Sequence, residues 1–413
     1  MNPVAQLLVI VAGLLLIGAF GEFVFSRTGI PDVIWLVLAG IFAGPIFEVV
    51  SPRMLEPAVP FFGAIALTII LSGGASRLRL TDVAAAAPRG LFLAFVGFVF
   101  SVASVYSYFW TLTKLELVKP VSSLSWLIAG AIVGGSALVV MPTPAGVKVD
   151  PRVSHLLEVE SSGTDALSIV MTMVLIDLVV TGSVDLASPF VALAREIGIG
   201  VTFGLLVAAV LIPVLPALCD KPHGYTVFLA SMLILYALTQ LANGNGALAV
   251  VTGALLIGNA STLVPKVIPG AHPEAFVFTE TARVMQDQMI FLIKSFFFVL
   301  IGLMFPTSLR LIVLGALGAL VLLLFRIPAV KLSTINLGFT KKQTWLTIVA
   351  IPRGLAAGVL STLPLQYGIA GAENFSPGVF ALIVTTIVLF AIGFAVVSRM
   401  SDASWSAARA SGL

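Results

Sequence analysis

The chain has 413 residues, of which 59% are hydrophobic and only 10% are charged. A soluble domain carries about 25% charged residues, so this composition excludes an ordinary soluble protein and indicates a polytopic membrane protein. The formal net charge of +3 gives no reason to expect nucleic-acid binding, and a single cysteine, Cys219, excludes an internal disulfide framework and a cysteine metal site. His155, His223 and His272 fall in loops or at helix ends, which argues against a histidine metal centre. We therefore expect a protein without a cofactor that is not an enzyme.

Apolar runs separated by charged, proline or glycine residues predict an all-α polytopic protein with about thirteen transmembrane helices. Several runs are longer than a simple crossing needs, which predicts tilted or kinked helices. No basic segment precedes the first run, so we expect a retained helix there and not a signal peptide. The expected spans are residues 3–21, 31–50, 58–75, 87–111, 122–142, 153–180, 188–215, 224–242, 245–260, 280–305, 308–332, 343–365 and 375–399.

Lysine and arginine are distributed unevenly over the loops. With an odd number of spans, the loops on the side of the C-terminus carry about three times as many basic residues as the others, which places that side in the cytoplasm. The sequence therefore predicts a multi-pass protein of the plasma or inner membrane, with the N-terminus outside.

The span 153–180 carries carboxylates in its first half, with Asp165 furthest from the start. A rise of roughly 1.5 Å per residue puts Asp165 about 16 Å into the helix, close to the bilayer midplane. A carboxylate at that depth costs on the order of 3 kcal/mol or more and is usually functional. Ser161, one turn earlier on the same face, and Thr164 add neutral oxygens suited to a monovalent cation or a proton. The alternative is a buried, hydrogen-bonded aspartate that only holds helices together.

Two other spans are interrupted by glycine and proline at membrane depth. Residues 129–144 contain Gly134, Gly135 and Ser136, and residues 350–365 contain Pro352 and Arg353. Interrupted helices at corresponding places in the two halves of a chain are typical of transporters built from inverted repeats, whose unwound backbone binds the ion.

A buried arginine needs a carboxylate, and Arg353 is the clearest basic residue inside an apolar span. Glu160 lies five residues before Asp165, so it is turned by roughly 140° around the helix and faces a different neighbour. The sequence therefore predicts a structural buried pair between Glu160 and Arg353, which leaves Asp165 for the ion. The alternative is that Arg353 extends its charge to the membrane surface.

Six stretches in order resemble the monovalent cation:proton antiporter family, in its sodium/proton exchanger (NhaP-like) branch. The resemblance implies two crossed, unwound helices, a homodimer in membrane lipid, and Asp165 binding cation and proton alternately. It also implies one transporter unit over residues 1–413, with an ion-translocating core at 87–180 and 308–399 and a dimerisation part at 1–75 and 188–305. The stretches are GIPDVIWLVLAGIFAGP at 29–45, the Gly-Gly span end at 71–80, ESSGTD at 160–165, GNGALAVVTGALLIGN at 244–259, FFFVLIGL at 296–303 and PRGLAAGVLSTLP at 352–364.

The chain departs from the family pattern at three places. Thr164 replaces the asparagine of the family's Asn-Asp pair, Ser136 and Ala137 replace a Thr-Asp pair, and Ser72 stands where a glutamate often precedes the Gly-Gly. One acidic group, Asp165, therefore remains at the expected site, which suits an electroneutral exchange of one Na+ or K+ for one proton. Two alternatives stay open on the same fold: a transporter of organic anions, and a channel or sensor.

Overall fold

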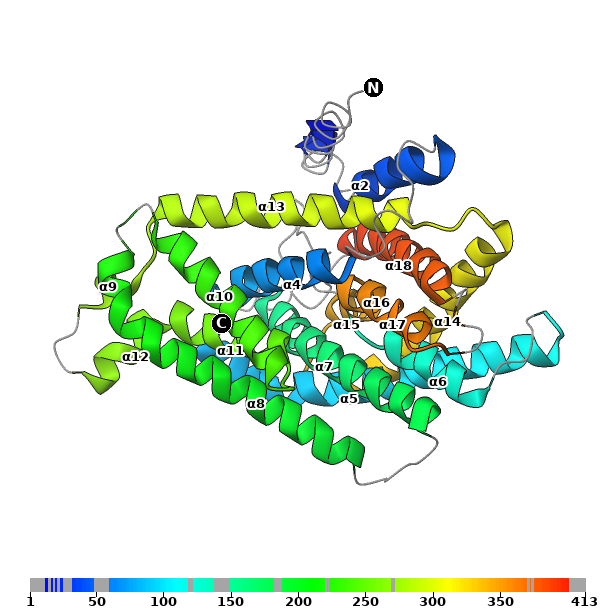
Figure 1. Cartoon of the computed structure of the whole chain (residues 1–413), viewed down its shortest axis with the longest axis horizontal. Coiled ribbons are helices and arrows are strands. Elements are labelled where there is room, and N and C mark those ends of the chain that lie inside the picture. The colour runs from blue at the N-terminus through cyan, green and yellow to red at the C-terminus, as the bar shows by residue number, and fades with distance from the viewer. Residues whose placement is uncertain are drawn as a thin grey trace, which may run out of the picture. The chain divides into compact units, whose positions relative to one another are not determined.

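The structure is a computed structural model, and helices are the only regular elements in the part of the chain that it describes (Figure 1). The helices confirm that this is an all-α polytopic protein. Most of the expected first span, 3–21, lies outside the described residues. The described residues are 12–13, 16–17, 19–20, 23–24, 32–47, 59–117, 122–136, 149–181, 188–219, 221, 223–268, 272–369, 372 and 375–400.

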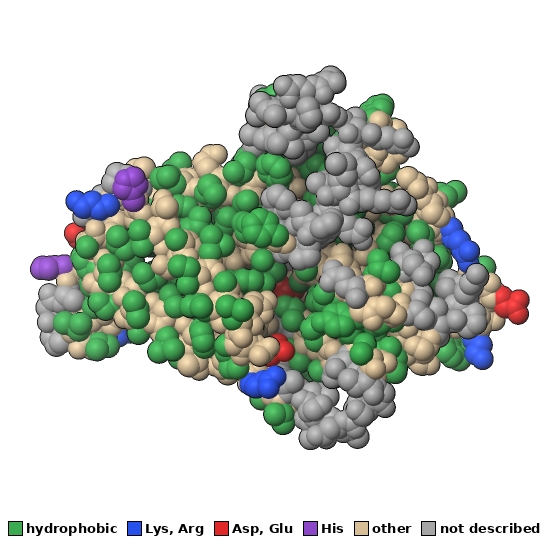
Figure 2. All heavy atoms as spheres, in the orientation of Figure 1, with side chains coloured by type: hydrophobic (Ala, Val, Ile, Leu, Met, Phe, Trp, Pro, Cys, Tyr) green, Lys and Arg blue, Asp and Glu red, His purple; other side chains and the backbone are tan. Residues whose placement is uncertain are grey.

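Seven of the described helices are long and apolar enough to cross a membrane, and an eighth crossing results if α11 and α12, which meet at 66°, form one bent span. Hydrophobic side chains also cover much of the described surface visible in Figure 2, with few charged groups among them. In chain order the helices are α2 Asp32–Ile41, η1 Phe42–Ile46, α4 Val59–Ala75, α5 Leu80–Lys114, α6 Ser123–Ile132, α7 Pro151–Thr181, α8 Ser188–Leu211, η4 Ile212–Val214, α9 Leu215–Leu218, α10 Gly224–Leu241, α11 Gly246–Gly258, α12 Ala260–Val267, η5 Pro273–Phe276, α13 Glu280–Leu303, α14 Leu309–Ser333, α15 Lys341–Val349, α16 Leu355–Leu360, α17 Leu363–Gln366 and α18 Phe375–Ser398.

Polar side chains define where several of these helices begin. The Ser122 hydroxyl accepts a hydrogen bond from the backbone N–H of Ser125 at the start of α6. Thr340 and Gln343 form a reciprocal capping box at the start of α15. Such caps satisfy backbone donors that have no partner within the helix, and they stop the helix from extending backwards.

The chain folds into two compact units. Unit 1 contains residues 1–56, 86–183 and 298–413, and unit 2 contains residues 57–85 and 184–297. The division into a moving core and a dimerisation part remains a prediction.

In unit 2, α11 packs against α8, α4 and α10. Small residues permit this close packing, because a Cβ added to Gly204 of α8 would lie 2.7 Å from the carbonyl oxygen of Ala249 in α11. The side chain of Asn259, between α11 and α12, donates to the Leu78 carbonyl and accepts from the Leu80 N–H. These two bonds fix the link between α4 and α5 against the bend that follows α11.

In unit 1, α7 packs against α6, α15 and α16, while α18 packs against α14 and α15. The N-terminal α2 meets the C-terminal end of α13, and a Cβ added to Gly40 would lie 2.8 Å from the Cα atom of Gly302. Gly40 therefore allows a close helix approach, with a second glycine as its partner. This packing brings the two interrupted helices of the chain against the middle of α7.

Candidate ion-binding site

Both glycine- and proline-rich interruptions are breaks in helices. Helix α6 ends at Ile132, and Gly134, Gly135 and Ser136 continue without helical structure. The second break, residues 350–354, separates α15 from α16. The remainder of the first interruption, residues 137–148, lies outside the described residues. Each break leaves backbone carbonyls and N–H groups without their helical partners, so these groups must find others.

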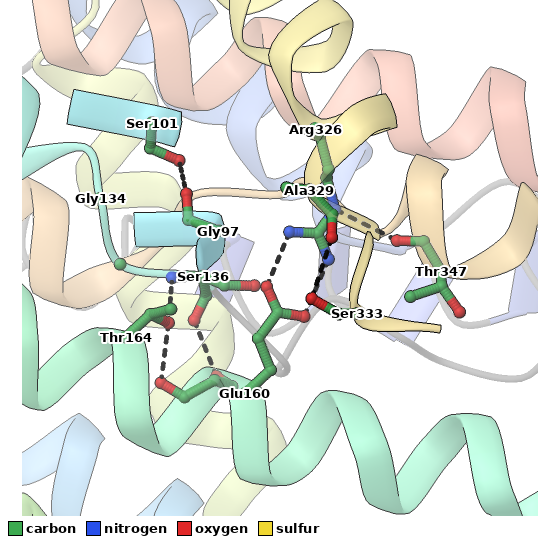
Figure 3. Close-up of polar contacts among 12 residues, drawn as sticks. Gly97, Ser101, Gly134, Ser136, Glu160, Thr164, Arg326, Ala329, Ser333 and Thr347 are labelled. Atoms are coloured by element: carbon green, nitrogen blue, oxygen red, sulfur yellow. Dashed lines mark hydrogen bonds and ion pairs between the residues drawn. The ribbon is translucent and has the colours of Figure 1, made fainter. Parts of the chain in front are cut away.

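Helix α7 supplies such partners to the segment after α6 (Figure 3). The backbone N–H of Ser136 donates to the Thr164 hydroxyl at 3.0 Å, and the Ser161 hydroxyl donates to the Ser136 carbonyl oxygen at 2.7 Å. The Thr164 hydroxyl in turn donates to the Ser161 carbonyl at 3.1 Å. The structure therefore brings the three predicted neutral residues together, although Ser136 takes part through its backbone. Their role as ion ligands remains a prediction.

Asp165 faces the same unwound backbone. A Cβ added to Gly135 would lie 2.7 Å from Asp165 Oδ1, so the carboxylate occupies the space that a side chain at residue 135 would need. Ser136, Ser161 and Thr164 are buried, whereas Asp165 keeps an intermediate share of its surface accessible. Asp165 is thus the one residue of these four that is not fully buried.

Arg353, which lies in the second break, binds the backbone of the first break. Its guanidinium Nη1 donates to the carbonyl oxygens of Gly134 at 3.0 Å and Gly135 at 2.7 Å, and Nη2 donates to the Ser101 hydroxyl on α5 at 3.0 Å. The side chain is only 2% exposed. A positive charge on carbonyls at the C-terminal end of a helix is electrostatically favourable, because that end of the helix dipole is negative. Arg353 therefore holds the unwound segment in place and does not extend to a membrane surface.

The prediction that Glu160 pairs with Arg353 is wrong, because a different arginine binds Glu160. Glu160 accepts hydrogen bonds from Arg326 of α14, from Nη1 at 2.7 Å and from Nη2 at 2.8 Å. Arg326 Nε also donates to the Thr347 carbonyl of α15 at 3.1 Å, so the side chain joins three helices (Figure 3). The two-pronged geometry satisfies both carboxylate oxygens, which a buried carboxylate requires.

The sequence pattern singled out Arg353, and neither Arg326 nor Ser101 was predicted as part of the cluster. Arg326 lies in the apolar run 308–332, and a charged residue in such a run was a sufficient signal for a buried pair. Ser101 carried no comparable signal, because α5 contains several serines and threonines of similar appearance. Among the described residues, no group of three or more His, Cys, Asp or Glu side chains gathers to hold a metal ion. Apart from the Glu160 carboxylate, which Arg326 binds, the cluster offers the Asp165 carboxylate, hydroxyls and backbone carbonyls.

The sequence profile of a family described as "Sodium/hydrogen exchanger, transmembrane" matches residues 11–399. The chain belongs to this family. The resemblance to cation:proton antiporters that the six stretches suggested is therefore confirmed.

Two curated relatives are similar over most of this exchanger-family chain. It is 27% identical over 379 residues to the K(+)/H(+) antiporter NhaP2 of Shewanella baltica (strain OS223). This alignment covers 88% of this chain and 61% of that protein. It is also 25% identical over 404 residues to the K(+)/H(+) antiporter NhaP of Alkalimonas amylolytica. That alignment covers 94% of this chain and 65% of the relative. The chain thus spans less than two thirds of the length of these relatives.

A solved structure has the same fold as this family member. It is the sodium proton antiporter MjNhaP1 from Methanocaldococcus jannaschii at pH 8, with a TM-score of 0.75 and 22% sequence identity. The match covers 95% of this chain and 100% of the other. The interrupted helices around Asp165 therefore belong to a fold known from an antiporter.

Proposed function

We propose that the chain is a secondary antiporter that exchanges Na+ and/or K+ for H+, and that Asp165 binds the cation or the proton. The main support is the position of the Asp165 carboxylate beside the unwound backbone at Gly135, on the helix whose Ser161 and Thr164 hydroxyls also bind this segment. Carboxylate, hydroxyl and carbonyl oxygens at an interrupted helix are the ligands that transporters use for monovalent cations.

The charge distribution around α7 also supports this assignment. Glu160 is neutralised by Arg326, and Arg353 is held by the Gly134 and Gly135 carbonyls. Asp165 lies within electrostatic reach of Arg353 but forms no ion pair with it among the described residues, so it is the carboxylate in this cluster that is available to a transported ion. An organic anion would meet the negative charge of Asp165, so the alternative of an anion transporter is less favourable.

Exchange follows from competition for one carboxylate. A bare anion in a membrane interior is costly, so Asp165 favours a state in which a proton or a cation neutralises it. If the core of residues 87–180 and 308–399 moves only in a neutralised state, each crossing carries either a cation or a proton. The cycle is then alternating access with one charge in each direction, so it is electroneutral.

The named relatives differ in the cation that they exchange. Both curated relatives are named as K(+)/H(+) antiporters, and the solved relative is named as a sodium proton antiporter. We propose that this chain takes either ion, with Thr164 and Ser161 as neutral ligands. We also propose the thirteen-helix homodimer with crossed unwound helices, the cytoplasmic C-terminus and the external N-terminus that the sequence predicts.

The decisive experiment measures proton movement in proteoliposomes that hold a preformed pH gradient. Addition of Na+ or K+ should dissipate the gradient, and Li+ and Rb+ should define the order of preference. Thiocyanate, a permeant anion that collapses the membrane potential, should leave the rate unchanged if exchange is electroneutral. Absence of proton movement with all four cations would contradict the proposed function.

A further inference from the structure

Two buried hydroxyl groups on α7 lack a hydrogen-bond partner among the described residues, as does Ser295 on α13, whereas other buried serines and threonines in helices have one. A buried serine or threonine in a helix usually donates to the carbonyl four residues earlier. Thr68, Thr239 and Ser333, all 0% exposed, do so toward Ala64, Leu235 and Ala329. Ser168 and Thr172 are equally buried at 0% exposure, yet their hydroxyls have no hydrogen-bond partner among the described residues.

Ser168 and Thr172 lie on the face of α7 that carries Asp165. They follow Asp165 by three and seven residues, the spacing that aligns side chains along one side of a helix. A Cβ added to Gly135 would lie 3.2 Å from Ser168 Oγ and 2.7 Å from Asp165 Oδ1. The hydroxyl of Ser168 and the carboxylate of Asp165 therefore face the same point beside the unwound backbone.

A buried hydroxyl without a partner destabilises the folded state, because its hydrogen bonds to water are lost without replacement. An alanine at residue 168 would avoid this cost. The hydroxyls of Ser161 and Thr164 differ, since they donate to the Ser136 and Ser161 carbonyls. Ser168 is thus an uncommitted oxygen beside Asp165.

We propose that the Ser168 hydroxyl is a further oxygen ligand of the transported monovalent cation. Thr172, one turn further along α7, is the next polar group on the route between Asp165 and the C-terminal end of the helix. This inference rests on the proposed function of the Asp165 site. It adds a residue that influences cation affinity without carrying charge.

The test compares Ser168→Ala with Ser168→Thr, which keeps a hydroxyl, and with Ser168→Cys, which keeps the size but offers a poor ligand for Na+ or K+. Ser333→Ala is the matched control, because it removes an equally buried hydroxyl that is bound to its own helix. Thr172→Val is compared in the same way with Thr239→Val. Each variant is assayed in proteoliposomes for the apparent KM for K+ and Na+, and in detergent for its melting temperature without either cation.

Ser168→Ala and Ser168→Cys should raise the apparent KM about tenfold, the effect of losing one favourable oxygen contact. Their melting temperature without cation should equal or exceed that of the wild type, since the hydroxyl has no partner to lose. Thr172→Val should slow exchange more than it changes KM. Ser168→Thr, which keeps the hydroxyl, should raise KM less than Ser168→Ala does, whereas Ser333→Ala and Thr239→Val should keep the wild-type KM.

An unchanged KM in both Ser168→Ala and Ser168→Cys would overturn the assignment. A raised KM together with a melting temperature clearly below that of the wild type would also overturn it, because the variant would then be damaged in its fold. The wild type and Asp165→Asn separate this failure from failure of the proposed function. Only the Ser168 inference is wrong if the wild type exchanges cations for protons, Asp165→Asn does not, and Ser168→Ala keeps the wild-type KM. If the wild type shows neither exchange nor a cation-dependent melting shift, both proposals are wrong.

Discussion

The Glu160 carboxylate on α7 is held by the guanidinium of Arg326 on α14 through two hydrogen bonds of 2.7 and 2.8 Å. The side chains are only 1% and 5% exposed, respectively. Because Arg326 also binds the Thr347 carbonyl of α15, the pair connects three helices at a depth where a single charge is costly. Asp165, five residues after Glu160, is not needed to neutralise this arginine.

Arg326→Ala should destabilise the protein severely, because it strands the buried Glu160 carboxylate. Loss of one partner of a buried ion pair costs about 3–5 kcal/mol. Size-exclusion chromatography and thermal melting should show a low yield of folded protein and a lower melting temperature. Adding Glu160→Gln to Arg326→Ala should recover part of the loss, while Arg399→Ala, at an exposed position, serves as the control. A normal melting temperature for Arg326→Ala would show that the pair is unimportant.

Arg353→Ala should disturb the ion site as well as stability. It removes the donors to the Gly134 and Gly135 carbonyls, and a hydrogen bond to a charged group contributes about 1.5–3 kcal/mol. We expect a lower melting temperature together with a higher apparent KM for the cation, measured on the same preparation. Arg353→Lys keeps a charged donor and should lose less of both. A well-folded and fully active Arg353→Ala protein would be incompatible with this role.

The hydroxyls of Ser161 and Thr164 should affect cation affinity more than maximal rate. Ser161→Ala and Thr164→Ala remove contacts to the unwound segment and leave the charge of Asp165 in place, so the apparent KM for the cation should rise. Ser136→Ala should have the smallest effect, because Ser136 takes part through its backbone N–H and carbonyl. Initial rates over a range of Na+ and K+ concentrations provide the measurement. Unchanged affinity in all three variants would place the site elsewhere.

Asp165→Asn should abolish exchange without unfolding the protein. The amide keeps the size and one carbonyl oxygen but removes the charge, so cation binding and proton coupling should disappear together. The melting temperature should be equal to or above that of the wild type, because the cost of burying a charge is gone. The wild type should be stabilised by added cation, since a ligand that binds only the folded state raises its stability. Exchange by Asp165→Asn would refute the central assignment.

Asp150, immediately before α7 and outside the membrane span, should make stability depend on pH. Its carboxylate accepts from the Arg152 N–H at 2.8 Å and from the Gln343 side chain at 2.6 Å. Partial burial raises the pKa of Asp150, but the hydrogen bonds and charge of Arg152 and the bond from Gln343 outweigh burial, so the pKa is lowered.

Because the folded pKa of Asp150 lies below the unfolded value of about 4, the stabilisation is present above that value and is lost as the pH falls through the folded pKa. Asp150→Ala should therefore lower stability at neutral pH by about 1 kcal/mol, as expected for loss of a helix cap. Melting curves from about pH 7 down to about pH 3 should show that the variant loses less stability in acid than the wild type. Parallel curves for the two proteins would contradict this role.

The sequence by itself determined the features that depend on composition and on spacing along one helix. The apolar runs identified a polytopic helical protein, and the expected span 153–180 corresponds to α7 at Pro151–Thr181. Glycine and proline located both helix breaks, because these residues weaken a helix wherever it is placed. The nearness of Ser161, Thr164 and Asp165 also followed from spacing, since residues three and four apart share a helix face.

Only the tertiary structure decided which distant groups meet. Arg326 and Arg353 both lie in apolar spans, and nothing in the spacing along the chain shows which of them reaches Glu160. The arginine that does, Arg326, lies 166 positions after Glu160. The choice depends on how α7, α14 and α15 pack, and packing is a property of whole helix surfaces. The same holds for Ser168, because whether a helical hydroxyl bonds to its own backbone or faces a neighbour depends on what the neighbouring helix presents. Here the neighbour is a glycine at the end of a broken helix, and it leaves room for an oxygen of Asp165 and an oxygen of Ser168 at one place.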